Sequence, residues 1–158
     1  MVKYDDASWH YGGDFPKDLT EENAATHIGM FLVWCINNDL ISDELKEISK
    51  KDIDDVKSRK MTGSEFLFKI CDEKFIDCDL SEFGQKFTND YYEDSRSKFA
   101  RKFGEYIRDL ADIFNEKAEK NGFEYETLYH VENTWENYDL IAKKLDERFV
   151  QWKNFKKK

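Results

Sequence analysis

The chain has 158 residues, enough for one domain of ordinary size that buries its own core without metals or disulfides. A formal net charge of −9 disfavours nucleic-acid binding, and three cysteines, an odd number, suit a reducing compartment. No apolar run approaches the ~18 residues that span a bilayer, and a secretory signal pattern is missing, so we expect a soluble, cytoplasmic protein without a membrane partner.

The opening segment, residues 4–16, is predicted to be irregular. Gly12 and Gly13 interrupt any periodicity, and the only proline of the chain closes the segment. Trp9 and Phe15 are large and apolar, so we expect both to pack onto the body of the protein. The segment is therefore predicted to be an ordered, aromatic-rich lead into the first long helix.

Residues 24–36 form the most hydrophobic stretch, with apolar residues at helical spacing after an N-cap at Thr20. This pattern predicts a central helix. Gly29 lies inside it, where glycine costs ~1 kcal/mol relative to alanine. We therefore expect another group to approach the backbone at Gly29, and Trp9 or Tyr11 is a candidate.

Shorter helices are predicted next. Residues 42–60 show weak helical periodicity. Thr62 with Glu65, and Asp79 with Glu82, each have the spacing of a capping box ahead of an apolar run. The pattern indicates three helices between residues 42 and 91.

The last third of the chain is predicted to hold two long helices. Ser95 begins the longest clear helical pattern, which Asn121 and Gly122 end. Residues 127–131 alternate loosely and predict a short extended segment, and Thr134 caps the final helix.

The predicted fold is mostly α, a single-domain multi-helix bundle spanning residues 1–158, with an irregular aromatic-rich N-terminal segment. No internal repeat or linker divides it. The spacing of three and four residues predicts that one core buries the following side chains: Ile28, Phe31, Leu32, Phe99, Phe103, Leu110, Leu145 and Phe149.

One polar cluster could hold a site. Asp5, Asp6, His10 and Asp14 share the opening segment, with His27 close in sequence, and could offer oxygen and nitrogen ligands. The spacing matches neither an EF-hand nor a zinc site. We therefore predict no metal and no cofactor.

Sequence motifs for catalysis are missing. The chain has no phosphate-binding loop, no nucleophile elbow and no dinucleotide fingerprint. His27 and His130 are predicted to be hydrogen-bonded, partly buried histidines. We predict no enzyme; the alternative, a small enzyme or small-molecule binder using Asp5, Asp6, His10 and His27, stays open.

Charge is unevenly distributed along the chain. Residues 1–94 hold 22 acidic and 11 basic side chains, a net charge of −11, and residues 95–158 hold 12 acidic and 14 basic, a net charge of +2. The acidic part repels nucleic acid and favours a basic protein partner. The lysines at 156–158 are interpreted as a solubility feature.

Two stretches near the start carry a resemblance: residues 4–16, YDDASWHYGGDFP, and residues 22–34, ENAATHIGMFLVW. Shorter pieces extend it along the chain, among them TGSEFL at 62–67 and TWENY at 134–138. The chain resembles a bacterial family of small helical proteins found among immunity proteins of polymorphic and contact-dependent toxin systems. The family lends no catalytic residues.

The resemblance implies an immunity protein that binds and neutralises a cognate toxin domain, a nuclease, by stoichiometric binding. Because nucleases that grip RNA or DNA tend to be basic, an acidic surface suits such a partner. The identity of the toxin and the oligomeric state stay open. The predicted partner-binding residues are Asp52, Asp54, Asp55, Asp72, Glu73, Asp77 and Asp79.

Overall fold

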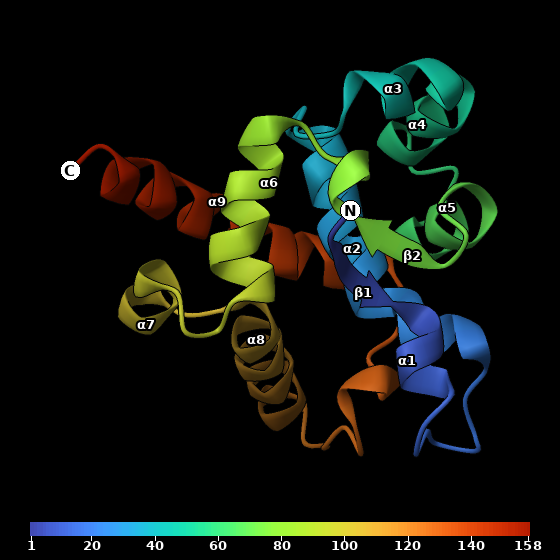
Figure 1. The fold of residues 1–158 in the computed structure, drawn as a ribbon. Helices are drawn as coiled ribbons and strands as arrows, with labels where there is room; N and C mark the ends of the chain where they lie inside the picture. Colours follow the sequence, from blue (N-terminus) through green and yellow to red (C-terminus); the bar gives the residue numbers. More distant parts are fainter.

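A helix that is apolar on all sides forms the centre of the molecule. The computed structural model describes residues 1–158 and shows α2 (Thr26–Asn37) surrounded by the other helices (Figure 1). Every residue from Thr26 to Ile36 is buried, as expected for a helix without a polar face. A 3₁₀ helix, η1 (Glu21–Ala25), leads into it, and Thr20 forms a capping box with Asn23.

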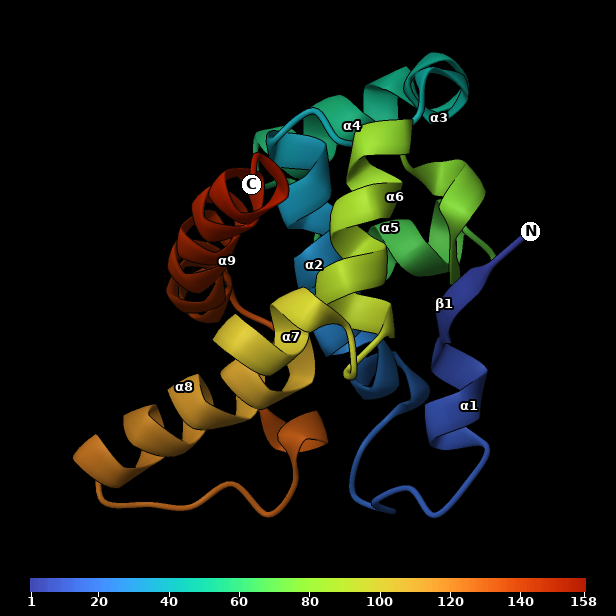
Figure 2. The ribbon, with the colours of Figure 1, turned by 60° about the vertical axis from the view of Figure 1, so that its left-hand side comes forward.

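The remaining elements cover α2 on several sides. In Figures 1 and 2, α6 and α9 pack on different sides of α2, α3 and α4 lie beyond one end, and α1 lies near the other. Their bounds are β1 (Lys3–Asp6), α1 (Ala7–Tyr11), α3 (Asp43–Ile48), α4 (Lys50–Lys57), α5 (Gly63–Ile70), β2 (Lys74–Ile76), the 3₁₀ helix η2 (Asp77–Asp79), α6 (Glu82–Thr88), the π-helix η3 (Asn89–Glu93), α7 (Lys98–Phe103), α8 (Tyr106–Lys120), the 3₁₀ helix η4 (Leu128–His130) and α9 (Trp135–Lys156).

The opening segment is more regular than predicted. Strand β1 pairs antiparallel with β2, with Asp6 opposite Lys74, and α1 follows directly. The side chain of Asp6 caps α1 by accepting a hydrogen bond from the Ser8 amide at 2.9 Å. The sequence missed both elements because a four-residue strand and a five-residue helix are too short to show periodicity.

Trp9 does not pack into the body, and that expectation is wrong. Its residue is 56% exposed, on the outer side of α1, and the Lys3 ammonium lies 5.0 Å from the centre of its ring. Ala7 is the residue of α1 that is fully buried. A large ring on a short helix therefore faces solvent, whereas Phe15 packs against the core as a partly buried residue.

Gly29 is the site of a close approach, but neither Trp9 nor Tyr11 makes it. The backbone of α5 crosses α2 there: a Cβ on Gly29 would lie 2.5 Å from the carbonyl carbon of Gly63 and from the amide nitrogen of Ser64. Two glycines facing each other let the two helix backbones touch. Thr62 and Glu65 form the predicted capping box and fix where α5 begins.

Four predicted boundaries are wrong. Residues 42–60, expected as one helix, form α3 and α4, because Ser49 between them has φ −127° and ψ 28° and ends the first helix. Ser81 caps α6, whereas the Asp79 carboxylate accepts from the Ile76 amide at 3.0 Å in the turn before it. The helix expected from Ser95 is two helices, α7 and α8, because Gly104 between them has φ +129°, which no helix accommodates. Residues 127–131 contain the 3₁₀ helix η4 instead of an extended segment.

The core is aromatic and largely as predicted. Six of the eight predicted core residues are buried, whereas Phe103 and Phe149 are partly buried and pack against the others. Phe87 and Tyr91 stack at 5.3 Å between ring centres, next to Phe31. The mostly helical fold is confirmed, as is the N-cap of α9 at Thr134.

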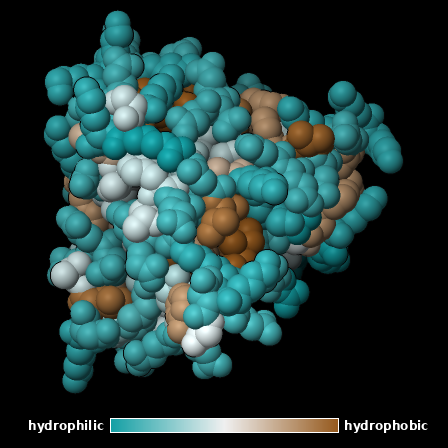
Figure 3. All heavy atoms as spheres, turned by 180° about the vertical axis from the view of Figure 1, so that it is seen from behind, coloured by the Kyte–Doolittle hydropathy of each residue, from teal (hydrophilic) through white to brown (hydrophobic).

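The face of the molecule opposite the view of Figure 1 is predominantly hydrophilic. Seen from behind, hydrophobic residues reach the surface as separate small patches among hydrophilic ones (Figure 3). No helix combines the length and the apolar character that crossing a membrane requires.

Candidate functional site

Asp5 is the centre of a buried polar cluster. Strand β1 turns its carboxylate inward, and the side chain is only 11% exposed. Four groups donate hydrogen bonds to it: the Asp6 amide at 2.9 Å, His10 Nε2 at 2.7 Å, His27 Nε2 at 3.2 Å and the Tyr92 hydroxyl at 2.5 Å. The carboxylate is therefore fully engaged by donors from four segments of the chain.

The two histidines are positioned by different helices. His10 lies on α1, which Asp6 holds at its start, and His27 lies in the first turn of α2. Their rings meet edge to face, 4.6 Å between centres. The Tyr106 hydroxyl donates to the His27 carbonyl oxygen at 2.6 Å, which fixes the start of α2 against α8.

Tyr129 extends the cluster toward the surface. Its hydroxyl lies 2.7 Å from His10 Nδ1, and its ring packs 5.0 Å from that of Phe15. Tyr129 comes from η4, which the side chain of Thr127 caps. The cluster thus joins the opening segment to a loop more than a hundred residues later.

Hydrogen bonding keeps Asp5 ionised. Burial alone raises the pKa of Asp5, but the hydrogen bonds from His10, His27 and Tyr92, together with the charge interaction with His27, hold that pKa well below its ordinary value. Burial, followed by the nearby Asp5 charge, raises the pKa of Tyr92 well above its ordinary value. The same two causes raise the pKa of Tyr129.

The ionised carboxylate decides the tautomers. Because a carboxylate only accepts, both Nε2 atoms carry their hydrogen, and His10 in its neutral form accepts from the Tyr129 hydroxyl through Nδ1. Tyr129, His10 and Asp5 therefore form a hydroxyl–imidazole–carboxylate relay. In chemical terms, such a relay can move a proton to or from a hydroxyl group.

A metal ion would fit the ligand types of this cluster but not its hydrogen bonding. Asp5, His10 and His27 each place a ligand atom within 4.8 Å of the other two. The Nε2 atoms of His10 and His27 already donate to Asp5, so a metal held by these two nitrogens and Asp5 would have to displace both hydrogen bonds and reverse both tautomers. Asp5, His10 and His27 line neither the hollow at the end of α8 nor the hollow between α6 and α9.

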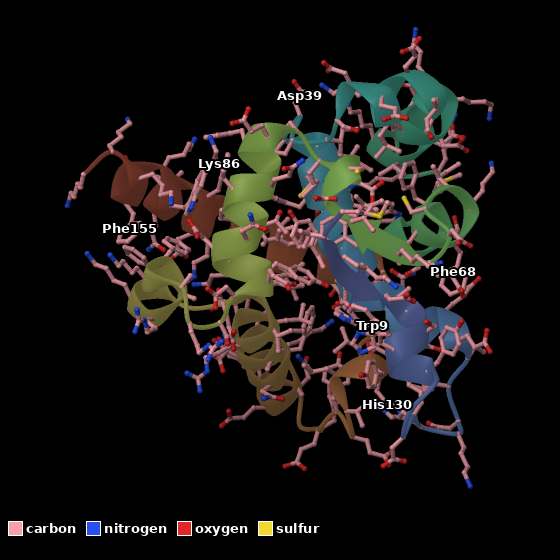
Figure 4. All side chains as sticks on the ribbon, viewed as in Figure 1. Trp9, Asp39, Phe68, Lys86, His130 and Phe155 are labelled. Atoms are coloured by element: carbon pink, nitrogen blue, oxygen red, sulfur yellow. The ribbon has the colours of Figure 1, made fainter.

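The side chain of Asp6 has another role than the sequence suggested, and His130 lies outside the cluster. The side chain of Asp6 is not in the cluster, because it caps α1 and pairs with Lys3 at 2.9 Å. His130 is partly buried, as predicted, and lies beside α1 (Figure 4), 3.0 Å from the Asp18 carboxylate. His27 is buried and hydrogen-bonded, in agreement with its prediction. Asp14 is exposed and joins none of these contacts.

Several of the carboxylates predicted to bind a partner already form ion pairs or hydrogen bonds within the protein. Asp52 pairs with Lys69 at 2.8 Å, and Asp55 with Lys51 at 3.3 Å. Asp54 is exposed on the same helix, α4. The first three predicted carboxylates, Asp52, Asp54 and Asp55, therefore lie on one helix, and two of them are neutralised by lysines.

The second group lies around β2. Asp72 pairs with Lys74 at 2.7 Å, and Glu73 accepts from the Tyr11 hydroxyl at 3.1 Å. Asp77 and Asp79 belong to η2 and are only partly exposed. This group offers a partner less free charge than its sequence suggests.

Asp79 provides a test of that burial. Burial, reduced in part by the Ile76 amide, raises the pKa of Asp79 to about 6. The stabilisation from its protonation is fully present below pH ~4 and is lost as pH rises through the folded pKa. We expect Asp79→Asn, which keeps an acceptor for Ile76, to raise the free energy of unfolding at pH 7 by about 3 kcal/mol and to leave it nearly unchanged at pH ~4. Urea unfolding at the two pH values measures this difference, and an equal effect at both would contradict it.

Sequence reasoning missed the tyrosines of the cluster. Tyr92 and Tyr129 lie 87 and 119 residues from their partners, so no local pattern could connect them to Asp5 or His10. The only signal was the abundance of tyrosine near polar residues, and this does not single out individual positions.

Comparisons with known proteins identify the family but no activity. The search of curated proteins and the search of solved structures both found no match. One family profile matches residues 3–131, which include the whole Asp5 cluster and leave α9 outside the match. The chain therefore belongs to the family described as "Domain of unknown function (DUF7832)".

Proposed function

We propose that this protein binds a basic toxin domain and neutralises it by stoichiometric binding, as an immunity protein does. Two arguments support the proposal: the resemblance to immunity proteins that we infer from the opening stretches of the sequence, and an acidic surface that the fold assembles from two loops. The surface carries the proposal, because most of its carboxylates form no ion pair within the protein and offer negative charge to a basic partner.

We call this surface the acidic loop face. It consists of residues 12–25 and 122–136. The second loop begins at the free end of α8 and runs to the first loop (Figures 1 and 2), where His130 of η4 contacts Asp18. Lys17 is its only lysine or arginine, against eight exposed carboxylates, a net charge of −7. The carboxylates are Asp14, Asp18, Glu21, Glu22, Glu124, Glu126, Glu132 and Glu136.

The face also offers an apolar anchor. Phe123 is 41% exposed and lines a hollow with Ala118 and Tyr125 at the end of α8. Aromatic residues at the centre of an interface contribute much of the binding energy, whereas charges at its rim set the association rate. An apolar residue beside unpaired carboxylates suits a basic protein that presents its own hydrophobic side chain.

We predict that reversing Glu21, Glu22 and Glu124 to Lys slows association with the toxin domain about tenfold at ~20 mM salt and has little effect above ~0.3 M salt. None of the three forms an ion pair in the protein, so the fold should tolerate the change. The partner to be tested is the product of the reading frame directly upstream, and stopped-flow mixing measures the rate.

The charge-matched control reverses Asp52, Asp54 and Asp55, the carboxylates on α4 that the sequence suggested. If only the reversal of these three α4 carboxylates slows association, the toxin contact lies on α4, and its assignment to the acidic loop face is wrong. If the two proteins neither bind nor restore growth when expressed together, the proposed function itself is wrong.

A second candidate function rests on the relay of Tyr129, His10 and Asp5. A hydroxyl aligned with an imidazole and a buried carboxylate is an arrangement that enzymes use for proton transfer. Turnover by the purified chain that disappears in His10→Ala, together with failure to rescue growth, would favour this enzyme over the immunity protein.

A further inference from the structure

A basic surface lies far from the acidic loop face. Helix α9 begins beside that face and ends, after 22 residues or about 33 Å, among lysines. Helix α7 packs against the same end of α9, where the Phe155 ring lies 5.8 Å from that of Phe99 and 6.1 Å from that of Phe103. Figure 4 shows Phe155 on the side of α9 that faces α7. We call the resulting surface the basic face: Arg96, Lys98, Arg101, Lys102, Lys153, Lys156, Lys157 and Lys158.

The lysines at the end of the chain are therefore more than three isolated charges. The aromatic contacts bring the cations of α7, about fifty residues earlier, to the same end of α9.

The charges of the basic face are not neutralised within the protein. All eight side chains are exposed, and only Lys156 forms an ion pair, at 3.0 Å from Asp90. Lysines on the opposite side, such as Lys51, Lys69 and Lys74, each pair with an aspartate. Like charges held close together on a folded surface repel each other, and an anionic partner relieves that repulsion.

A hollow with an apolar floor lies within this surface. Phe83 of α6 and Val150 of α9 line it and are 47% and 53% exposed, above the buried ring of Trp152. The rings of Phe83 and Trp152 lie 5.2 Å apart. Lys153, Lys156 and Lys157 complete its rim.

We propose that the basic face binds an acidic segment of another protein, with one apolar side chain in the hollow and carboxylates against the lysines. The apolar hollow can accommodate an aliphatic or aromatic side chain, which a phosphate backbone does not provide. The net charge of −9 opposes a long polyanion such as nucleic acid, whereas a short acidic segment contacts only this end. The proposal stands on different residues from the proposed toxin contact.

The probe is a fluorescein-labelled peptide of glutamates around a single leucine, measured by fluorescence anisotropy. We expect the double variant Lys153→Glu with Lys157→Glu to weaken binding about tenfold at ~20 mM salt, and Phe83→Ala to weaken it about fivefold at every salt concentration. The charge-matched control, Lys50→Glu with Lys57→Glu on α4, should change binding less than about twofold. Circular dichroism confirms that each variant is folded.

Four outcomes would overturn the proposal. If the α4 control lost as much affinity for the peptide as the Lys153/Lys157 double variant, binding would depend on the net charge of the protein and not on this surface. Tighter binding of single-stranded DNA of equal charge, lost in the same double variant, would assign the face to nucleic acid. Concentration-dependent dimers in sedimentation, dissociated by that variant, would place a second copy of the chain there. Unchanged binding when serine replaces the peptide leucine would remove the role of the hollow.

Discussion

Gly29→Ala is expected to lower the free energy of unfolding by about 3 kcal/mol, although alanine is the better helix former by ~1 kcal/mol. The added methyl group would lie 2.5 Å from backbone atoms of Gly63 and Ser64, and backbone cannot turn aside as a side chain can. Helices α2 and α5 would have to separate, which opens the core around the central helix. Urea unfolding monitored by tryptophan fluorescence measures the loss.

Gly13→Ala is the matched control. Its new methyl group would meet nothing closer than the Trp9 carbonyl oxygen at 3.8 Å, an ordinary contact, and the residue is exposed. Its effect should stay within about 0.5 kcal/mol. A Gly29→Ala variant as stable as the native protein would show that α2 and α5 do not pack backbone to backbone.

This contact marks the limit of what the sequence could predict. A glycine inside an apolar helix indicates that something approaches its backbone, because the residue is otherwise unfavourable there. The identity of the approaching group depends on how α5 crosses α2, and no local pattern encodes a contact between positions 34 residues apart. The sequence therefore located the contact and named the wrong partners, Trp9 and Tyr11.

Helix boundaries show the same division between local and distant causes. The caps at Thr62 and Thr134 were predictable, because a cap is formed within four residues. The break at Gly104 was not, because the apolar spacing continues across it and only the backbone turn separates α7 from α8. Hydrophobic periodicity indicates which side of a helix is buried. It does not indicate whether one helix continues or two successive helices follow each other.

The candidate site and the charged faces depend even more on distant contacts. Asp5, His10 and His27 were grouped from the sequence, but Tyr92 and Tyr129 reach them only through the packing of η3 and η4. Likewise, the net charges of the two parts of the chain did not reveal the acidic loop face, since half of its carboxylates lie in the part with net charge +2. Charge becomes a binding surface only after folding.

Asp5→Asn is expected to lower the free energy of unfolding by about 3 kcal/mol at pH 7. The amide presents a donor where the carboxylate accepted from His10, His27 and Tyr92, so at least one buried donor loses its partner. Because the folded pKa of Asp5 is lowered, the stabilisation by its charge is fully present above pH ~4 and is lost as pH falls toward the folded pKa. The difference between native protein and variant should therefore shrink below pH ~4.

The neighbouring substitution Asp6→Asn serves as the control, since asparagine caps a helix as well as aspartate does and the lost pair with Lys3 is partly exposed. It should cost less than about 1 kcal/mol, measured by the same urea unfolding at pH 7. A loss of about 3 kcal/mol in Asp5→Asn alone would show that the cluster anchors β1, α1 and α2 to each other. If Asp5→Asn instead left stability within about 1 kcal/mol of the native value, the buried charge would be dispensable for folding. The relay of Tyr129, His10 and Asp5 would then be the first place to look for catalysis.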